Sequence, residues 1–96
     1  MTAVHQLGPD STGRWLVTTQ RSTHVWDLDA GTYMRQPGDG SERFGLEGQP
    51  MKITRVERWP AVGDRSIVWF DDPEFPNVME HYRVSSAIRS IEQLDS

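Results

Sequence analysis

One stretch of the sequence decides the fold: RWLVTTQRSTHVWDLDAGTYMRQ, residues 14–36. Aromatic and β-branched residues dominate it and alternate between two faces, which is typical of β-strands. Asp29-Ala30-Gly31 has the composition of a three-residue hairpin loop, because Gly accepts the left-handed conformation that closes such a loop. Residues 20–23 provide a second tight connection. The stretch therefore predicts a three-stranded antiparallel meander, with strands over 14–20, 23–28 and 32–36.

Short apolar runs separated by turn residues continue towards the C-terminus. They predict strands over 51–59, 65–71 and 79–84, the first with a bulge near Arg55. For the last segment we expect a single 3₁₀ turn over residues 85–88 and a closing strand after it, with a short helix capped by serine as the alternative. The whole pattern predicts an all-β fold, a small antiparallel meander or SH3-like barrel of about six strands.

The length of 96 residues indicates one domain. Residues 1–13 contain Gly8, Pro9 and Gly13 with little periodicity, and we expect them to form a flexible N-terminal arm. Residues 14–96 are then a single β domain. Pro37 ends the meander and opens a long polar loop that reaches Pro50.

Composition excludes several classes of protein. Hydrophobic residues make up 35% of the chain and charged residues 25%, a balance that neither a disordered chain nor a membrane protein has. The absence of Cys excludes disulfides, zinc–thiolate sites and thiol catalysis. No apolar run is long enough for a membrane helix, and the first residues do not resemble a signal peptide. We expect a cytoplasmic protein that does not bind membranes.

The charge balance argues against nucleic acid as a partner. Ten basic residues against fourteen acidic ones give a net charge of -4, which provides no basic surface to neutralise phosphates. A small barrel that binds single strands by aromatic stacking stays an alternative, and it requires the Arg residues to gather on one face. The reverse alternative is an acidic mimic of nucleic acid, which requires aligned carboxylates.

Candidate chemistry along the chain is sparse. Asp71, Asp72 and Glu74 cluster in a turn but lack the acidic alternation of a calcium loop. The sequence contains no nucleophile elbow and no phosphate-binding Gly-rich loop, so we expect no catalytic residue, no cofactor and no metal. The alternative is a small metal-dependent enzyme that uses His24 and His81 with nearby carboxylates.

The aromatic residues are the most informative feature. Four Trp, three Phe and two Tyr exceed what so small a core encloses. Trp15, Trp26 and Trp69 lie within predicted strands, and their alternation assigns them to the core. Trp59 follows Arg58 at the end of a strand and precedes a proline, so we expect it to be exposed.

The aromatic and arginine residues that we expect outside the core predict a surface for binding another protein. Trp, Tyr and Arg are enriched in the energetically dominant positions of interfaces. We therefore predict a non-catalytic protein-interaction module, which binds another protein or pairs an edge strand with a second copy to form a homodimer. The predicted partner-binding residues are Trp59, Arg58, Tyr33, Arg35 and Phe75.

Several short motifs resemble a group of short actinobacterial and phage proteins. The motifs are Val17-Thr18-Thr19, Ser22-Thr23, Asp27-Leu28-Asp29-Ala30 with Thr32 and Arg35, Val62-Gly63, and Ser85-Ser86 through Ser90-Ile91-Glu92. The resemblance covers residues 14–94 and implies a compact β fold. It carries no catalytic residue over to this chain. It also implies an intracellular setting and an origin in a phage or a mobile element, and for a phage protein the expected partner is a host protein or a virion component.

Overall fold

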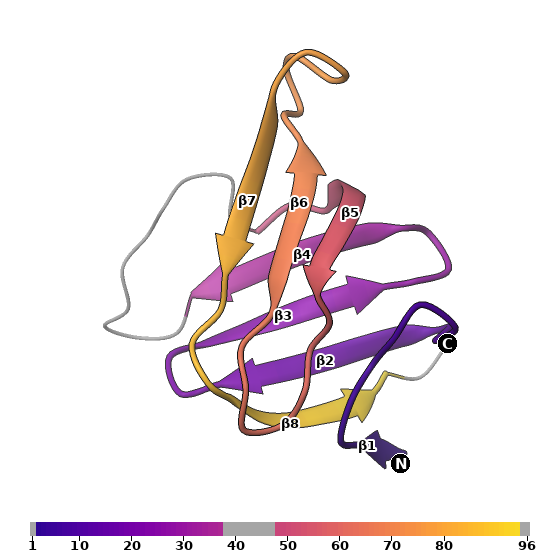
Figure 1. The fold of residues 1–96 in the computed structure, drawn as a ribbon, viewed down its shortest axis with the longest axis vertical. Helices are drawn as coiled ribbons and strands as arrows, with labels where there is room; N and C mark the ends of the chain where they lie inside the picture. Colours follow the sequence, from indigo (N-terminus) through magenta and orange to yellow (C-terminus); the bar gives the residue numbers. More distant parts are fainter. Residues whose placement is uncertain (1, 38–47, 95–96) are drawn as a thin grey trace.

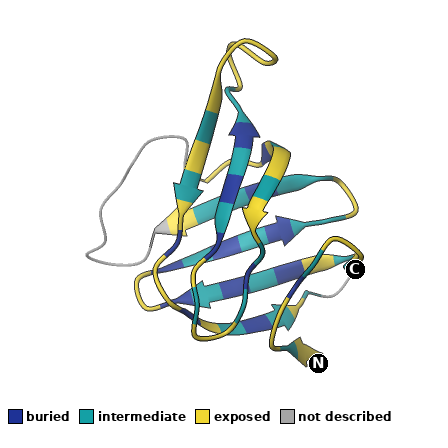
Figure 2. Cartoon of the chain, in the orientation of Figure 1, coloured by how far each residue is buried: buried dark blue, intermediate teal, exposed yellow. Residues whose placement is uncertain are grey.

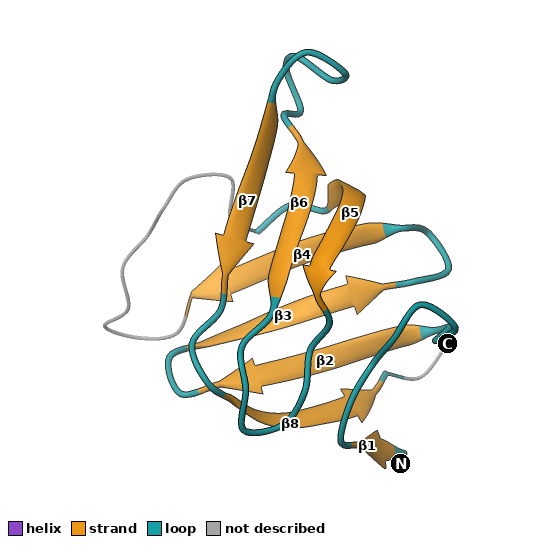
Figure 3. Cartoon of the chain, in the orientation of Figure 1, coloured by secondary structure: helices purple, strands orange, loops and turns teal. Residues whose placement is uncertain are grey.

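The computed structural model describes residues 2–37 and 48–94, and this part of the chain contains β-strands and no helix (Figure 3). The all-β class is therefore confirmed. The strands are β1 (Ala3–Val4), β2 (Arg14–Thr19), β3 (Ser22–Asp27), β4 (Thr32–Pro37), β5 (Met51–Arg58), β6 (Ile67–Asp71), β7 (Glu80–Val84) and β8 (Ile88–Gln93). Within the described ranges, no helix has the length and apolarity needed to cross a bilayer.

The eight strands form one antiparallel sheet in the order β1-β8-β2-β3-β4-β5-β6-β7. It folds into two layers, and β5, β6 and β7 lie across β3 and β4 (Figure 1). Only two residue pairs join the layers between β4 and β5, Thr32 with Lys52 and Tyr33 with Met51. The sheet stays open, with β1 and β7 at its edges, so the prediction of about six strands in an SH3-like barrel is not met. The two residues of β1 are too few to show a periodic pattern.

The meander predicted from residues 14–36 is confirmed. Strands β2, β3 and β4 pair in sequence order. Trp15 of β2 lies opposite Trp26 of β3, and Trp26 lies opposite Tyr33 of β4. At the second turn Gly31 has a φ of 72°, the left-handed conformation that the loop requires. The predicted irregularity in β5 is also present, because its register against β6 shifts between Ile53 and Arg55.

The core lies between the two layers and takes alternate residues of each strand. In β3 every second residue is buried, as Figure 2 shows by its alternating colours. Trp15 and Trp26 are buried as predicted, whereas Trp69 is half-buried and lies outside the core. The buried apolar residues are Leu7, Trp15, Val17, Trp26, Tyr33, Met51, Val68, Phe70, Ile88 and Ile91.

The C-terminal segment differs from the prediction. Residues 85–87 form neither a 3₁₀ turn nor a helix, and β8 begins at Ile88. The reason lies in the backbone donors. Ser85 N–H donates to Ser66 O at 2.9 Å and Ile88 N–H donates to Asp64 O at 2.8 Å, so distant carbonyls replace the local acceptors of a turn.

The N-terminal segment contributes to the packing. Ala3 and Val4 pair with β8, and Leu7 N–H donates to Pro60 O at 2.9 Å. The Leu7 side chain is only 1% exposed and belongs to the core. The sequence predicts a flexible arm over residues 1–13 because its few apolar residues show little periodicity, and such a pattern gives no sign of the Leu7 contact.

Replacing Leu7 tests the contribution of this segment. We expect Leu7→Ala to lower the free energy of unfolding by about 2–5 kcal/mol, because it removes buried methyl groups and leaves a cavity. Urea unfolding measures the loss, and Gln6→Ala is the matched control because Gln6 is exposed. Equal stability of the two variants would mean that residues 2–13 do not pack as described.

Candidate functional site

Exposed apolar side chains gather on the hairpin of β6 and β7. Val78 is 82% exposed and Tyr82 is 56% exposed. Together with half-buried Trp69 we call this set the hairpin surface. Its members are Trp69, Phe75, Val78, Met79, Tyr82 and Val84.

A stack of three side chains crosses the outer face of β5, β6 and β7. Cross-strand pairing places Arg55 opposite Trp69 and Trp69 opposite Tyr82. The Arg55 guanidinium lies 4.2 Å from the centroid of a Trp69 ring, and the Trp69 and Tyr82 rings are 4.9 Å apart. Trp69 Nε1 donates to Glu57 Oε1 at 3.1 Å. We call Arg55, Trp69 and Tyr82 the outer-face stack, since cation–π and ring contacts hold it together.

Sequence reasoning missed this stack because Trp69 lies in the most apolar run of the chain. Val68 and Phe70 are buried, so alternation alone places Trp69 on the opposite face. The strand that pairs with Trp69, β7, shows whether the outer face of β6 is covered. The exposed pattern of β7, with Glu80, Tyr82 and Val84 all exposed, indicates that this face is not covered.

Asp72 organises the loop that carries Phe75 and Val78. Its Oδ1 accepts the N–H groups of Glu74 at 2.8 Å and Phe75 at 3.0 Å, and its Oδ2 lies 2.7 Å from His81 Nε2. The hydrogen bond from His81, followed by the two backbone bonds, holds the pKa of the Asp72 carboxyl below its ordinary value. The loop that bears the most exposed apolar residue therefore has a defined backbone.

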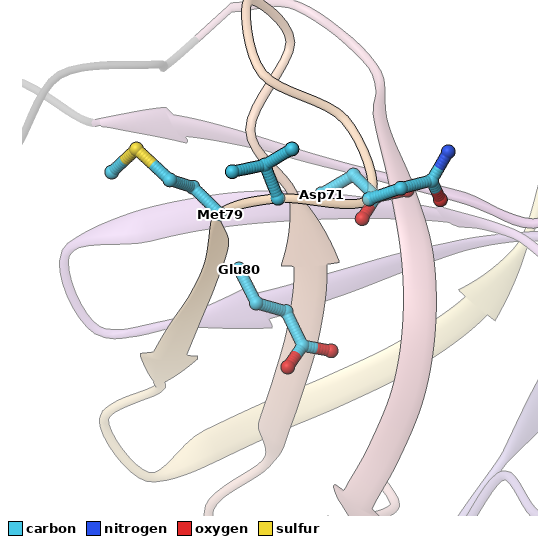
Figure 4. Close-up of a pocket in the computed structure, with 5 residues that line it drawn as sticks. Asp71, Met79 and Glu80 are labelled. Atoms are coloured by element: carbon cyan, nitrogen blue, oxygen red, sulfur yellow. The ribbon is translucent and has the colours of Figure 1, made fainter.

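A depression of about 240 Å³ lies beside this loop, between the end of β6 and the start of β7 (Figure 4). Asp71 and Glu80 face each other across the two strands, and Asn77, Val78 and Met79 complete the lining. Within the described residues, no group of three or more His, Asp or Glu has the arrangement of a metal site. The acidic turn singled out in the sequence is a hydrogen-bonded loop.

A buried polar chain occupies the inner side of β2, β3 and β4. His24 Nε2 lies 2.9 Å from Ser22 Oγ, and His24 Nδ1 lies 2.7 Å from the Tyr33 hydroxyl. Ser22 Oγ in turn lies 3.1 Å from Thr19 Oγ1. If Tyr33 donates to Nδ1 and Nε2–H donates to Ser22, every member of the chain has a partner.

Burial keeps His24 neutral. Its side chain is 3% exposed, and desolvation, reinforced by the positive charges of Arg35 and Arg83, lowers its pKa from 6.5 to about 4. Ser22 is 8% exposed and His24 contacts a phenol instead of a carboxylate, so the pair lacks both access and the usual orienting group of a nucleophile–base pair. The arrangement suits a structural hydrogen-bond chain.

The two histidines of the enzyme alternative lie in separate surroundings. His81 is on β7 and contacts Asp72, whereas His24 is on β3. The rings of Tyr33 and Phe70 stand between them in a series of ring contacts. The structure does not bring the two imidazoles to one site.

Two of the predicted partner-binding residues face the interior. Tyr33 is 3% exposed and stacks on Phe70 with centroids 5.9 Å apart. Arg35 is half-buried opposite His24 on the neighbouring strand. Tyr33 is therefore not available to a partner at the surface, because its side chain lies on the face of β4 that packs into the core.

The other three predicted residues lie apart. Trp59 is half-buried against Trp26, with ring centroids 6.1 Å apart. Arg58 is exposed and pairs with Asp64 at 2.5 Å. The Arg65 backbone N–H, followed by this bond from Arg58, lowers the pKa of Asp64. Phe75 lies in the β6–β7 loop, at the opposite end of β6 from Arg58. Of the predicted set, only Phe75 belongs to the hairpin surface.

The buried histidine predicts a pH dependence of stability. His24 has a lower pKa in the folded protein than in the unfolded chain, so the unfolded chain takes up the proton first as the pH falls. We expect the free energy of unfolding to drop by about 3 kcal/mol as pH falls from 6.5 to below 4, relative to the non-titrating variant His24→Gln. Urea unfolding over this pH series measures the difference, and parallel pH profiles would contradict it.

Removing the Asp72 carboxylate should loosen the hairpin loop. We expect Asp72→Ala to speed amide hydrogen exchange at Glu74 and Phe75, whose acceptor it removes. Because the folded pKa of Asp72 is lowered, this protection is present above the ordinary value of 3.8 and is lost as pH falls through the lower folded pKa. Glu74→Ala is the control, and equal exchange in both variants would remove Asp72 from its organising role.

Comparisons with known proteins add no further assignment to this geometry. No family model matches the chain, and no curated protein or solved structure matches it.

Proposed function

We propose that the chain is a non-catalytic protein-interaction domain and that the hairpin surface is its binding surface. The observation that carries the proposal is a single hairpin that bears five exposed large apolar side chains and the half-buried Trp69 ring. Contiguous exposed apolar patches on soluble domains mark interaction sites. Trp69, Tyr82 and Arg55 are also of the residue types that dominate binding energy in interfaces.

The proposed surface is organised before any partner binds. The outer-face stack fixes the Trp69 and Tyr82 rings against each other, and the bonds of Asp72 define the loop backbone. Binding then costs less conformational entropy than it would for a mobile loop. Carboxylates of Glu57, Glu80 and Asp71 near the stack favour a protein over the phosphates of a nucleic acid.

The resemblance to short actinobacterial and phage proteins supports a choice of partner. If the chain is phage-encoded, a host protein or a virion component in the cytoplasm fits this surface. Self-association through the same hairpin is the other form of protein binding, and it uses the same residues.

Site-specific photo-crosslinking in the native cell tests the proposal. We expect a photoreactive residue at Val78 to form covalent adducts with protein, at several times the yield obtained at Gln20, an exposed control in the β2–β3 turn. Tyr82→Ser in the same chain should reduce the yield at Val78, because it removes a central ring of the surface. Equal yields at Val78 and Gln20 would overturn the proposed function.

A further inference from the structure

The two edges of the sheet differ in how well they are protected. β1 has two residues, whereas β7 has five and no partner strand on its outer side among the described strands. Its register against β6 runs without a bulge from Ile67–Val84 to Asp71–Glu80. It contains neither Pro nor a bulge, two of the devices that stop edge pairing, and its charges, Glu80 and Arg83, are of opposite sign.

The hydrogen bonds at both ends of the hairpin determine which backbone groups of β7 are free. Asp72 N–H donates to Met79 O at 3.0 Å, and Ser85 N–H donates to Ser66 O at 2.9 Å. Bonded and non-bonded pairs alternate in an antiparallel ladder, so residues 79, 81, 83 and 85 direct their backbone groups towards β6. Glu80, Tyr82 and Val84 therefore direct theirs to the open edge, and their side chains lie on the exposed outer face.

We propose that two copies of this chain pair through β7, antiparallel, about a two-fold axis at Tyr82. This inference rests on the proposed function and names the partner as a second copy. The register that overlaps all of β7 sets Tyr82 against the partner's Tyr82 and Glu80 against the partner's Val84. All of these residues have outward backbone groups, so about six backbone hydrogen bonds join the two sheets.

Charge along the hairpin favours a second copy in this orientation. Asp71, Asp72 and Glu80 make one end of the β6–β7 pair acidic, whereas Arg65 and Arg83 make the other end basic, where Arg58 offsets the charge of Asp64. Antiparallel pairing brings the acidic end of one copy beside the basic end of the other, and parallel pairing would bring like charges together. At the axis the two Tyr82 rings meet, which continues the outer-face stack from one copy into the other.

Single thiols test the register, since the chain has no Cys of its own. Residues in a bonded antiparallel pair have Cα atoms about 5.5 Å apart, within the range of about 4.4–6.8 Å that a disulfide spans. We expect Tyr82→Cys to form a covalent dimer on mild oxidation many times faster than Gln20→Cys. A mixture of Glu80→Cys and Val84→Cys chains should cross-link faster than either variant alone.

A proline tests the backbone without removing the stack. Val84→Pro deletes an outward N–H that β6 does not use, and Val84→Ala shortens the same side chain but keeps that N–H. Light scattering over a concentration series should give a dimer for the natural chain, a small weakening for Val84→Ala, which loses side-chain contact only, and a weakening at least tenfold greater for Val84→Pro. Circular dichroism confirms that both variants are folded.

The outcomes separate this inference from the proposed function. A purified chain that is monomeric at every concentration, or a dimer that Val84→Pro leaves unchanged, overturns pairing through β7. If that monomer still forms adducts with a different protein at Val78 in the cell, the proposed function stands and the second copy is excluded. Equal cross-linking of Tyr82→Cys and Gln20→Cys overturns the register as well.

Discussion

Contact of the Tyr33 ring with both layers is the interaction on which the rest of the structure depends. Tyr33 meets Trp26 edge-on at 5.5 Å in its own layer and stacks on Phe70 at 5.9 Å in the other. Because only two residue pairs join β4 to β5, these ring contacts set how the layers cross. The Tyr33 hydroxyl also ends the buried chain through His24, so the same side chain serves apolar packing and polar satisfaction.

The crossing of the layers also explains why one face stays uncovered. Val68 and Phe70 point into the space between the layers, and Trp69 must then point outwards. In a chain of this length no further element covers the outer face of β5, β6 and β7 within the described residues. The Trp69 ring at that position contacts Arg55 and Tyr82 on either side and remains half-buried.

Much of the fold was predictable and little of the site was. The meander, its Gly31 turn and the bulge in β5 follow from alternation and turn chemistry, which act over a few residues. Trp15 and Trp26 were correctly assigned to the core, but Trp69 was not, because its run is apolar on both faces. Among the predicted binding residues, Tyr33 is in the core and only Phe75 lies on the hairpin surface. Alternation along a strand separates its two faces, but it does not show which face another part of the chain covers.

The sequence by itself determined where β2 to β7 lie and where the meander turns, since backbone propensity and side-chain alternation are local properties. Only the tertiary structure decided which face of β6 is covered, which strand ends the sheet and which backbone groups remain open. Those features depend on how the two layers cross and on long-range bonds such as those from Ser85 and Ile88. Their partners, Ser66 and Asp64, are separated from them along the chain by a whole hairpin, beyond the reach of any local pattern.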